Sequence, residues 1–154
     1  MLTAMVVPCE ETQLPPLTTD DDIERRVGDL IGRATSRQLW LLFLDEVDVQ
    51  LPILIPIEGL PSAPTDEQAV LVVERVRELM GEIGATSVIT VLERYGPAAL
   101  SAQDAEWVRS LRHGCADRGV NLRAQLLSHR KGVRWIAEDE LGATSDELGA
   151  DAKT

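Results

Sequence analysis

The segment of the sequence whose residue types could do chemistry is "SVITVLERYGPAALSAQDAEWV", residues 87–108. An apolar run ends at Glu93, a Gly-Pro loop follows, and Ser101 stands three residues before Asp104. Carboxylates and a hydroxyl that follow a buried strand could bind an ion or move a proton. The same Ser-x-x-Asp spacing is also an ordinary helix start, in which the serine and the acid satisfy free backbone N–H groups. We prefer the helix cap, and a cap does not exclude an older metal site.

Other groups could join these residues at the ends of strands. Glu58 follows an earlier apolar run, and it could meet Glu93 and Asp45 as a set of paired carboxylates, although solvated strand ends are the commoner explanation. Arg94 and Tyr95 lie on a loop after a buried strand, where binding residues tend to collect. The candidate binding residues are therefore Glu58, Glu93, Arg94, Tyr95, Ser101 and Asp104. We expect none of them to be catalytic and none to hold a metal.

Three helices that would position these residues are predicted by caps and by apolar side chains at helical spacing. The first begins at Thr19 or Asp20. The second follows Thr65, which begins a capping box, and ends at Gly84. The third covers residues 102–118.

The strands are predicted by continuous apolar runs, which indicate burial on both faces of a sheet. Pro52 and Pro56 place the second strand at an edge or at a bulge, because proline cannot donate to a ladder. The predicted strands cover residues 38–45, 49–57, 86–93, 120–129 and 132–137. The element order α-β-β-α-β-α-β-β predicts a single α/β domain with a mixed sheet and packed helices.

The chain divides into three parts. A flexible lead over residues 1–18, with three prolines and no period, precedes the α/β domain, which covers residues 19–137. Residues 138–154 are acidic and are expected to be a disordered tail.

The net charge of −11 argues against binding to nucleic acid, because neutralising phosphates requires a basic surface. The charge is uneven, since residues 107–135 carry seven basic side chains and one acidic one. We prefer the interpretation that the acidic tail neutralises this basic region, over a patch that binds an external anion. The apolar runs are too short to cross a membrane, and two unpaired cysteines, Cys9 and Cys115, favour the cytoplasm.

Residues 40–136 resemble the JAB/MPN metalloprotease-like fold, in its RadC-like branch. The resemblance rests on a pair of strands ending in "EGLP", a helix leading into "GATSVITV", and Ser101-x-x-Asp104. It implies a zinc site in which a His-x-His motif precedes the Ser-x-x-Asp, with a Glu on an earlier strand to which Glu58 is a loose analogue. The histidine positions are occupied here by Val91 and Glu93. Because a catalytic zinc requires three good protein ligands, the resemblance implies an inactive domain without cofactor.

Three functions remain open from the sequence. The first is a non-catalytic interaction module that binds a protein partner or associates with itself. The second is a small-anion sensor that uses the basic region 109–134. The third is a hydrolase in which Glu58, Glu93 and Asp104 complete an atypical carboxylate metal site. The sensor requires its cations to converge on one face: Arg109, Arg112, Arg123, Arg130 and Arg134.

Overall fold

The computed structural model describes residues 3–4, 7–8 and 15–142. Five strands form the body of a mixed sheet in the order β4-β3-β5-β6-β7. β5 and β6 are parallel, and the other neighbours are antiparallel. Their bounds are β3 Gln38–Leu44, β4 Gln50–Glu58, β5 Ser87–Glu93, β6 Leu122–His129 and β7 Gly132–Trp135. The single α/β domain with a mixed sheet is therefore confirmed.

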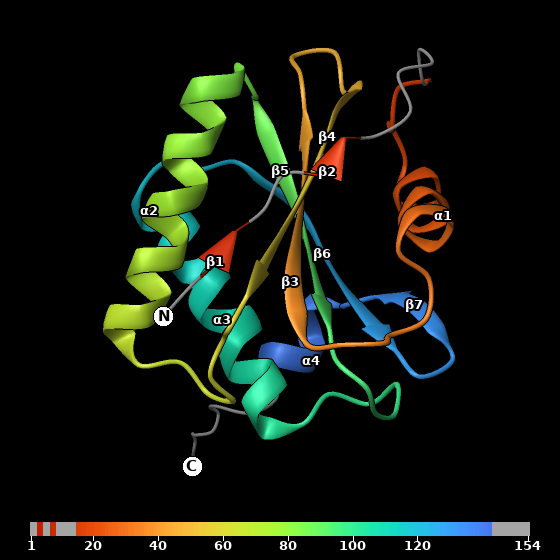
Figure 1. Cartoon of the computed structure of the whole chain (residues 1–154), viewed down its shortest axis with the longest axis vertical. Coiled ribbons are helices and arrows are strands. Elements are labelled where there is room, and N and C mark those ends of the chain that lie inside the picture. Colours follow the sequence, from red (N-terminus) through yellow and green to blue (C-terminus); the bar gives the residue numbers. More distant parts are fainter. Residues whose placement is uncertain (1–2, 5–6, 9–14, 143–154) are drawn as a thin grey trace.

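Helices cover both faces of the sheet (Figure 1). α2 and α3 pack on one face over Phe43, Leu92 and Leu127, and α1 packs on the other over Leu42 and Leu126. The described helices are α1 Asp20–Leu30, α2 Asp66–Ile83, α3 Ala102–Asp117 and the short α4 Glu138–Gly142. Because successive side chains of a strand point to opposite faces, each of the buried central strands contributes to both cores.

The helix starts follow the sequence prediction. Thr19, Thr65 and Ser101 are N-caps, and each forms a capping box with the side chain three residues later. α2 ends at Gly84, which has a φ of 74°. Only glycine adopts this left-handed conformation without steric cost, so the residue type explains where the helix stops.

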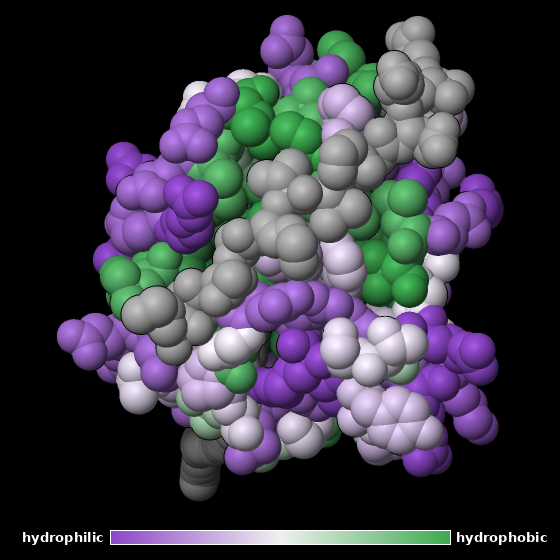
Figure 2. Space-filling model, viewed as in Figure 1, coloured by the Kyte–Doolittle hydropathy of each residue, from purple (hydrophilic) through white to green (hydrophobic). Residues whose placement is uncertain are grey.

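β4 lies near the edge of the sheet, as its prolines predicted. Its pairing with β3 shifts register between Leu42 and Leu44. Its outer side pairs with two short strands, β1 (Thr3–Ala4) and β2 (Val7–Pro8). Figure 2 shows apolar surface in the upper part of the molecule on this side, whereas the lower end is mostly polar.

The folded part extends beyond the bounds 19–137 expected from the sequence. Residues 3–4 and 7–8 belong to the sheet, and Leu17 is buried beside Ile23 of α1, so these parts of the expected flexible lead are held by backbone pairing and burial. At the other terminus α4 occupies the start of the expected disordered tail, and Leu141 is buried. The remaining residues of the lead up to 14, and residues 143–154, lie outside the described part. No helix in the described residues is long and apolar enough to cross a membrane.

Candidate functional site

The predicted site residues gather at the lower end of the sheet, where β5 ends. Glu93 is the last residue of β5, and Arg94 follows it. Both are buried, with 3% and 8% of their surface exposed. A buried charge is tolerated only when hydrogen bonds or an opposite charge compensate it, and each residue is compensated by a different set of partners.

Glu93 is surrounded by donors from the loop before β3 and from the start of β3 itself. The backbone N–H groups of Thr35 and Ser36 donate to its Oε2 at 2.7 and 3.1 Å. Its Oε1 accepts from Gln38 Nε2 and Trp40 Nε1, both at 2.8 Å. Both carboxylate oxygens are therefore occupied, and Glu93 fixes the loop that connects α1 to β3.

These donors outweigh burial in setting the ionisation of Glu93. Burial acts most strongly and by itself would raise the pKa of the carboxyl. The hydrogen bonds from Thr35, Gln38, Trp40 and Ser36 together lower the pKa below its ordinary value. Glu93 is therefore held as a charged carboxylate. Its lowered pKa is the opposite of the raised pKa expected of a general acid.

Arg94 organises the loop on the other side of the strand end. Its Nε and Nη2 donate to Asp104 Oδ2 at 2.9 and 2.8 Å. Its Nη1 and Nη2 also donate to the carbonyl oxygens of Pro97 and Ala99, at 2.7 and 2.8 Å. One guanidinium group therefore holds residues 94–101, named here the 94–101 loop, against the start of α3.

Asp104 joins this loop to the helix. The backbone N–H of Ser101 donates to its carboxylate at 2.9 Å, and Ser101 Oγ accepts from the backbone N–H of Asp104 at 3.0 Å. Burial would raise the pKa of Asp104, but the bonds from Arg94 and Ser101 lower it overall. The predicted helix cap is confirmed.

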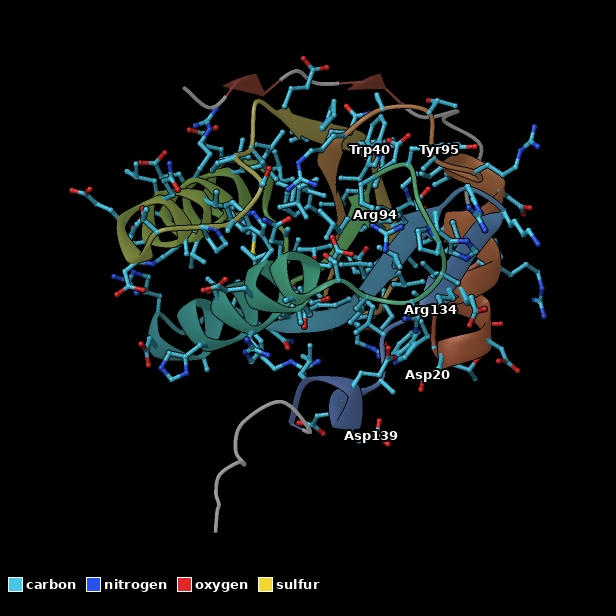
Figure 3. All side chains as sticks on the ribbon, turned by 90° about the horizontal axis from the view of Figure 1, so that it is seen from below. Asp20, Trp40, Arg94, Tyr95, Arg134 and Asp139 are labelled. Atoms are coloured by element: carbon cyan, nitrogen blue, oxygen red, sulfur yellow. The ribbon has the colours of Figure 1, made fainter. Side chains whose placement is uncertain are left out.

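Glu58 and Tyr95, the remaining predicted site residues, also lie at the lower end of the sheet. Glu58 and Glu93 flank Gln38 in one row across the sheet, and Glu58 is exposed. Tyr95 is 73% exposed, and it projects at the lower end beside Arg94, whereas Arg134 lies further along that end (Figure 3).

Asp45 lies at the opposite end of β3, where its side chain accepts from the backbone N–H groups of Val47 and Val49 within its own turn, so it does not join the other carboxylates.

The proposed carboxylate metal site is not assembled. Glu93 and Asp104 lie on opposite sides of the strand end, and each is already bonded to donors of the protein. Val91, at the other histidine position of the JAB/MPN pattern, is fully buried among apolar side chains. Within the described residues, no three His, Cys, Asp or Glu side chains are grouped so that they could hold a metal ion.

The basic region 109–134 does not converge on one face. Arg123 and Arg130 lie at opposite ends of β6. Arg123 pairs with Asp20 at 3.5 Å, at the start of α1. The start of the acidic tail supplies two other partners, since Glu138 lies 3.4 Å from Arg112 and Glu140 lies 2.8 Å from Arg134. This geometry supports neutralisation within the molecule over the anion sensor.

Sequence patterns did not reveal the donors around Glu93. Thr35 and Ser36 offer backbone groups, which leave no trace in residue type. Gln38 and Trp40 gave a weak signal, because they are the residues with polar atoms in an otherwise apolar strand. Polar atoms in a buried strand must find partners, and an acid at the end of the neighbouring strand can supply them.

No family model matches the sequence, and no curated protein matches it either. The class of the protein is therefore described from its fold and the geometry of its site. The protein is a small α/β domain in which charged residues at the end of a central strand order the adjoining surface loops.

Proposed function

We propose that the protein is a non-catalytic interaction module, which binds another protein or a second copy of itself through the 94–101 loop. The observation that carries the proposal is the position of Tyr95 on a loop that Arg94 holds from beneath. Arg94 binds two carbonyl oxygens of the loop and Asp104, while Tyr95 is 73% exposed. It is the most exposed of the large hydrophobic side chains in the described residues.

An ordered loop with an exposed tyrosine is suited to binding a protein. A loop that is fixed before binding loses less conformational entropy when a partner docks. Tyrosine adds a large contact area with few rotatable bonds, together with a hydroxyl for hydrogen bonding. Beside it lies a groove of about 520 Å³, whose lining includes Arg37, Pro97, Leu100 and Gln103.

A catalytic role is less well supported by the same geometry. Glu93 and Asp104 have lowered pKa values and are bonded to the protein's own donors. Neither carboxylate is therefore poised to exchange a proton near neutral pH. A hydrolase using Glu58, Glu93 and Asp104 would have to break the bonds that order two loops.

The proposal includes an origin in an inactive JAB/MPN-like domain. It is supported by the strand, loop and capped helix around Ser101 and Asp104, with Val91 and Glu93 in place of the histidines. We also propose a cytoplasmic location, which the free and buried thiol of Cys115 supports. The net charge of −11 supports a partner other than nucleic acid.

Affinity capture from a lysate of the source organism tests the proposal. The tagged wild type is compared with Tyr95→Ala and with Leu71→Ala, a control at a 58% exposed side chain on α2. We expect a stoichiometric partner, or a dimer by mass, with the wild type and with Leu71→Ala. Tyr95→Ala should lose it. A monomer without partner, or equal binding by all three proteins, would contradict the proposal.

A further inference from the structure

We infer that the partner of the 94–101 loop is an acidic protein segment, bound by the exposed cations Arg33, Arg130 and Lys131, which we name the basic end. This inference rests on the proposed function and specifies the chemistry of the partner. The chain has a net charge of −11, yet three free cations lie beside the 94–101 loop, which Arg94 holds against the start of α3.

Backbone hydrogen bonds bring three loops together at this end of the sheet. The N–H of Arg130 donates to the carbonyl of Gly96 at 2.9 Å, which joins the β6–β7 turn to the 94–101 loop. The N–H of Ala34 donates to the carbonyl of His129 at 2.9 Å, which joins the loop after α1 to the same turn. The basic end is therefore a surface formed by segments distant in sequence.

The cations of the basic end have no partner among the described residues. The side chains of Arg33, Arg130 and Lys131 are exposed, and none forms a hydrogen bond or ion pair there. Two carboxylates at this end of the sheet are already engaged, since Glu93 is surrounded by its donors and Asp104 pairs with Arg94. Glu140, likewise, is bonded to Arg134 through both of its oxygens.

Four cationic side chains surround the buried His129, which lies beneath this surface. Its side chain is largely enclosed, and burial is the main influence that lowers its pKa. The charges of Arg134, Arg94, Arg130 and Lys131 lower the pKa further, because each of them opposes a second positive charge on the imidazole. A positive potential at one end of a chain with a net charge of −11 directs an acidic partner to that end.

The shape of the surface favours a protein segment over a small anion. The free cations are exposed and lie on two loops instead of lining an enclosed pocket. The adjoining groove exposes Tyr95 and Pro97 and also includes the partly buried Leu100, so it offers apolar contacts as well as charge. An extended chain with carboxylates and an apolar side chain could contact both regions, whereas a phosphate ion could contact only the cations.

Binding of a fluorescent oligoglutamate peptide, measured by anisotropy at low salt, tests the inference. The variant R130E/K131E reverses two charges of the basic end. The variant R75E/R77E makes the same change in net charge on the exposed face of α2 and serves as the control. We expect R130E/K131E to weaken binding about tenfold or more, and R75E/R77E to stay within about twofold of the wild type. Added salt should weaken the binding of the wild type.

Three results of the peptide assay would overturn the inference. They are no binding of oligoglutamate, equal weakening by the two double variants, or full displacement of the peptide by inorganic phosphate of equal total charge. The last would indicate a site for simple anions. The capture experiment separates the inference from the proposed function. If a captured partner is lost with Tyr95→Ala but retained by R130E/K131E, the proposed function stands and the acidic partner is ruled out.

Discussion

Glu93 and Arg94 are adjacent in the chain, yet they hold two different loops on opposite sides of the strand end. Glu93 accepts hydrogen bonds from the segment before β3, and Arg94 donates to the loop before α3. Opposite charges next to each other in sequence therefore do not neutralise each other. Each is matched to the polar groups that its own loop leaves free, because backbone N–H groups require an acceptor and carbonyl groups require a donor.

Replacing Glu93 by Gln should destabilise the protein. The NH₂ group of glutamine would replace one carboxylate oxygen, and it would then face N–H donors that have lost their acceptor. We expect the free energy of unfolding to fall by about 3 kcal/mol. Glu58→Gln is the control, because Glu58 is exposed in the same row of the sheet, and it should change stability by less than about 0.5 kcal/mol. Urea denaturation measures both, and equal effects would contradict the structural role of Glu93.

The ionisation of Glu93 and Asp104 should make the stability of the protein depend on pH. The pKa values of Glu93 and Asp104 are lowered in the folded protein. Their contribution to stability is therefore complete above the unfolded pKa values of about 4, and it is lost as pH falls through the lowered folded values. Urea midpoints measured from neutral to acidic pH should fall steeply in this window for the wild type and less steeply for Glu93→Gln. Parallel curves would show that Glu93 does not contribute.

The Arg94–Asp104 pair should behave as one unit. Removing either partner by Arg94→Ala or Asp104→Ala leaves a buried charge without its partner, which should cost about 3–5 kcal/mol. The double variant should cost less than the sum of the two, with a coupling of about 1–3 kcal/mol. Arg94→Lys should not restore stability, because an ammonium group cannot hold the carboxylate and two carbonyl groups in the same geometry. Additive single effects in a double-mutant cycle would contradict this pairing.

Two helical glycines provide a matched test of the contact between α2 and α3. A Cβ added at Gly114 would lie 2.9 Å from Cγ2 of Val73, whereas a Cβ at Gly81 would meet nothing within 4 Å. We expect Gly114→Ala to destabilise the protein by about 1–2 kcal/mol, because the branched valine cannot move aside freely. Gly81→Ala should stabilise it by about 0.5–1 kcal/mol through helix propensity. Shifts of the melting temperature in the same direction would contradict this packing.

The thiol of Cys115 should be unreactive in the folded protein. Burial raises its pKa to about 11, so almost no thiolate is present near neutral pH. A thiol-reactive dye should label a Cys9→Ser variant, which retains Cys115, only at the rate at which the protein unfolds. Rapid stoichiometric labelling under native conditions would contradict the buried position.

Much of the fold was determined by local sequence. The three capped helices and the buried strands were predicted because capping residues, glycine stops and apolar periodicity act over a few residues. Ser101 and Asp104 were placed correctly as a cap for the same reason. The prolines likewise predicted that β4 lies near an edge of the sheet.

The roles of the charged residues were decided by tertiary structure. Glu93 and Arg94 were candidates for binding, but their partners come from residues 35–40 and from the loop around Pro97 and Ala99, and several are backbone groups. The pairing of Arg134 with Glu140 also depended on where the chain turns after β7. Residue type shows that a charge is present, whereas the partners that compensate a buried charge are set by which backbone groups the packed chain brings within hydrogen-bonding distance.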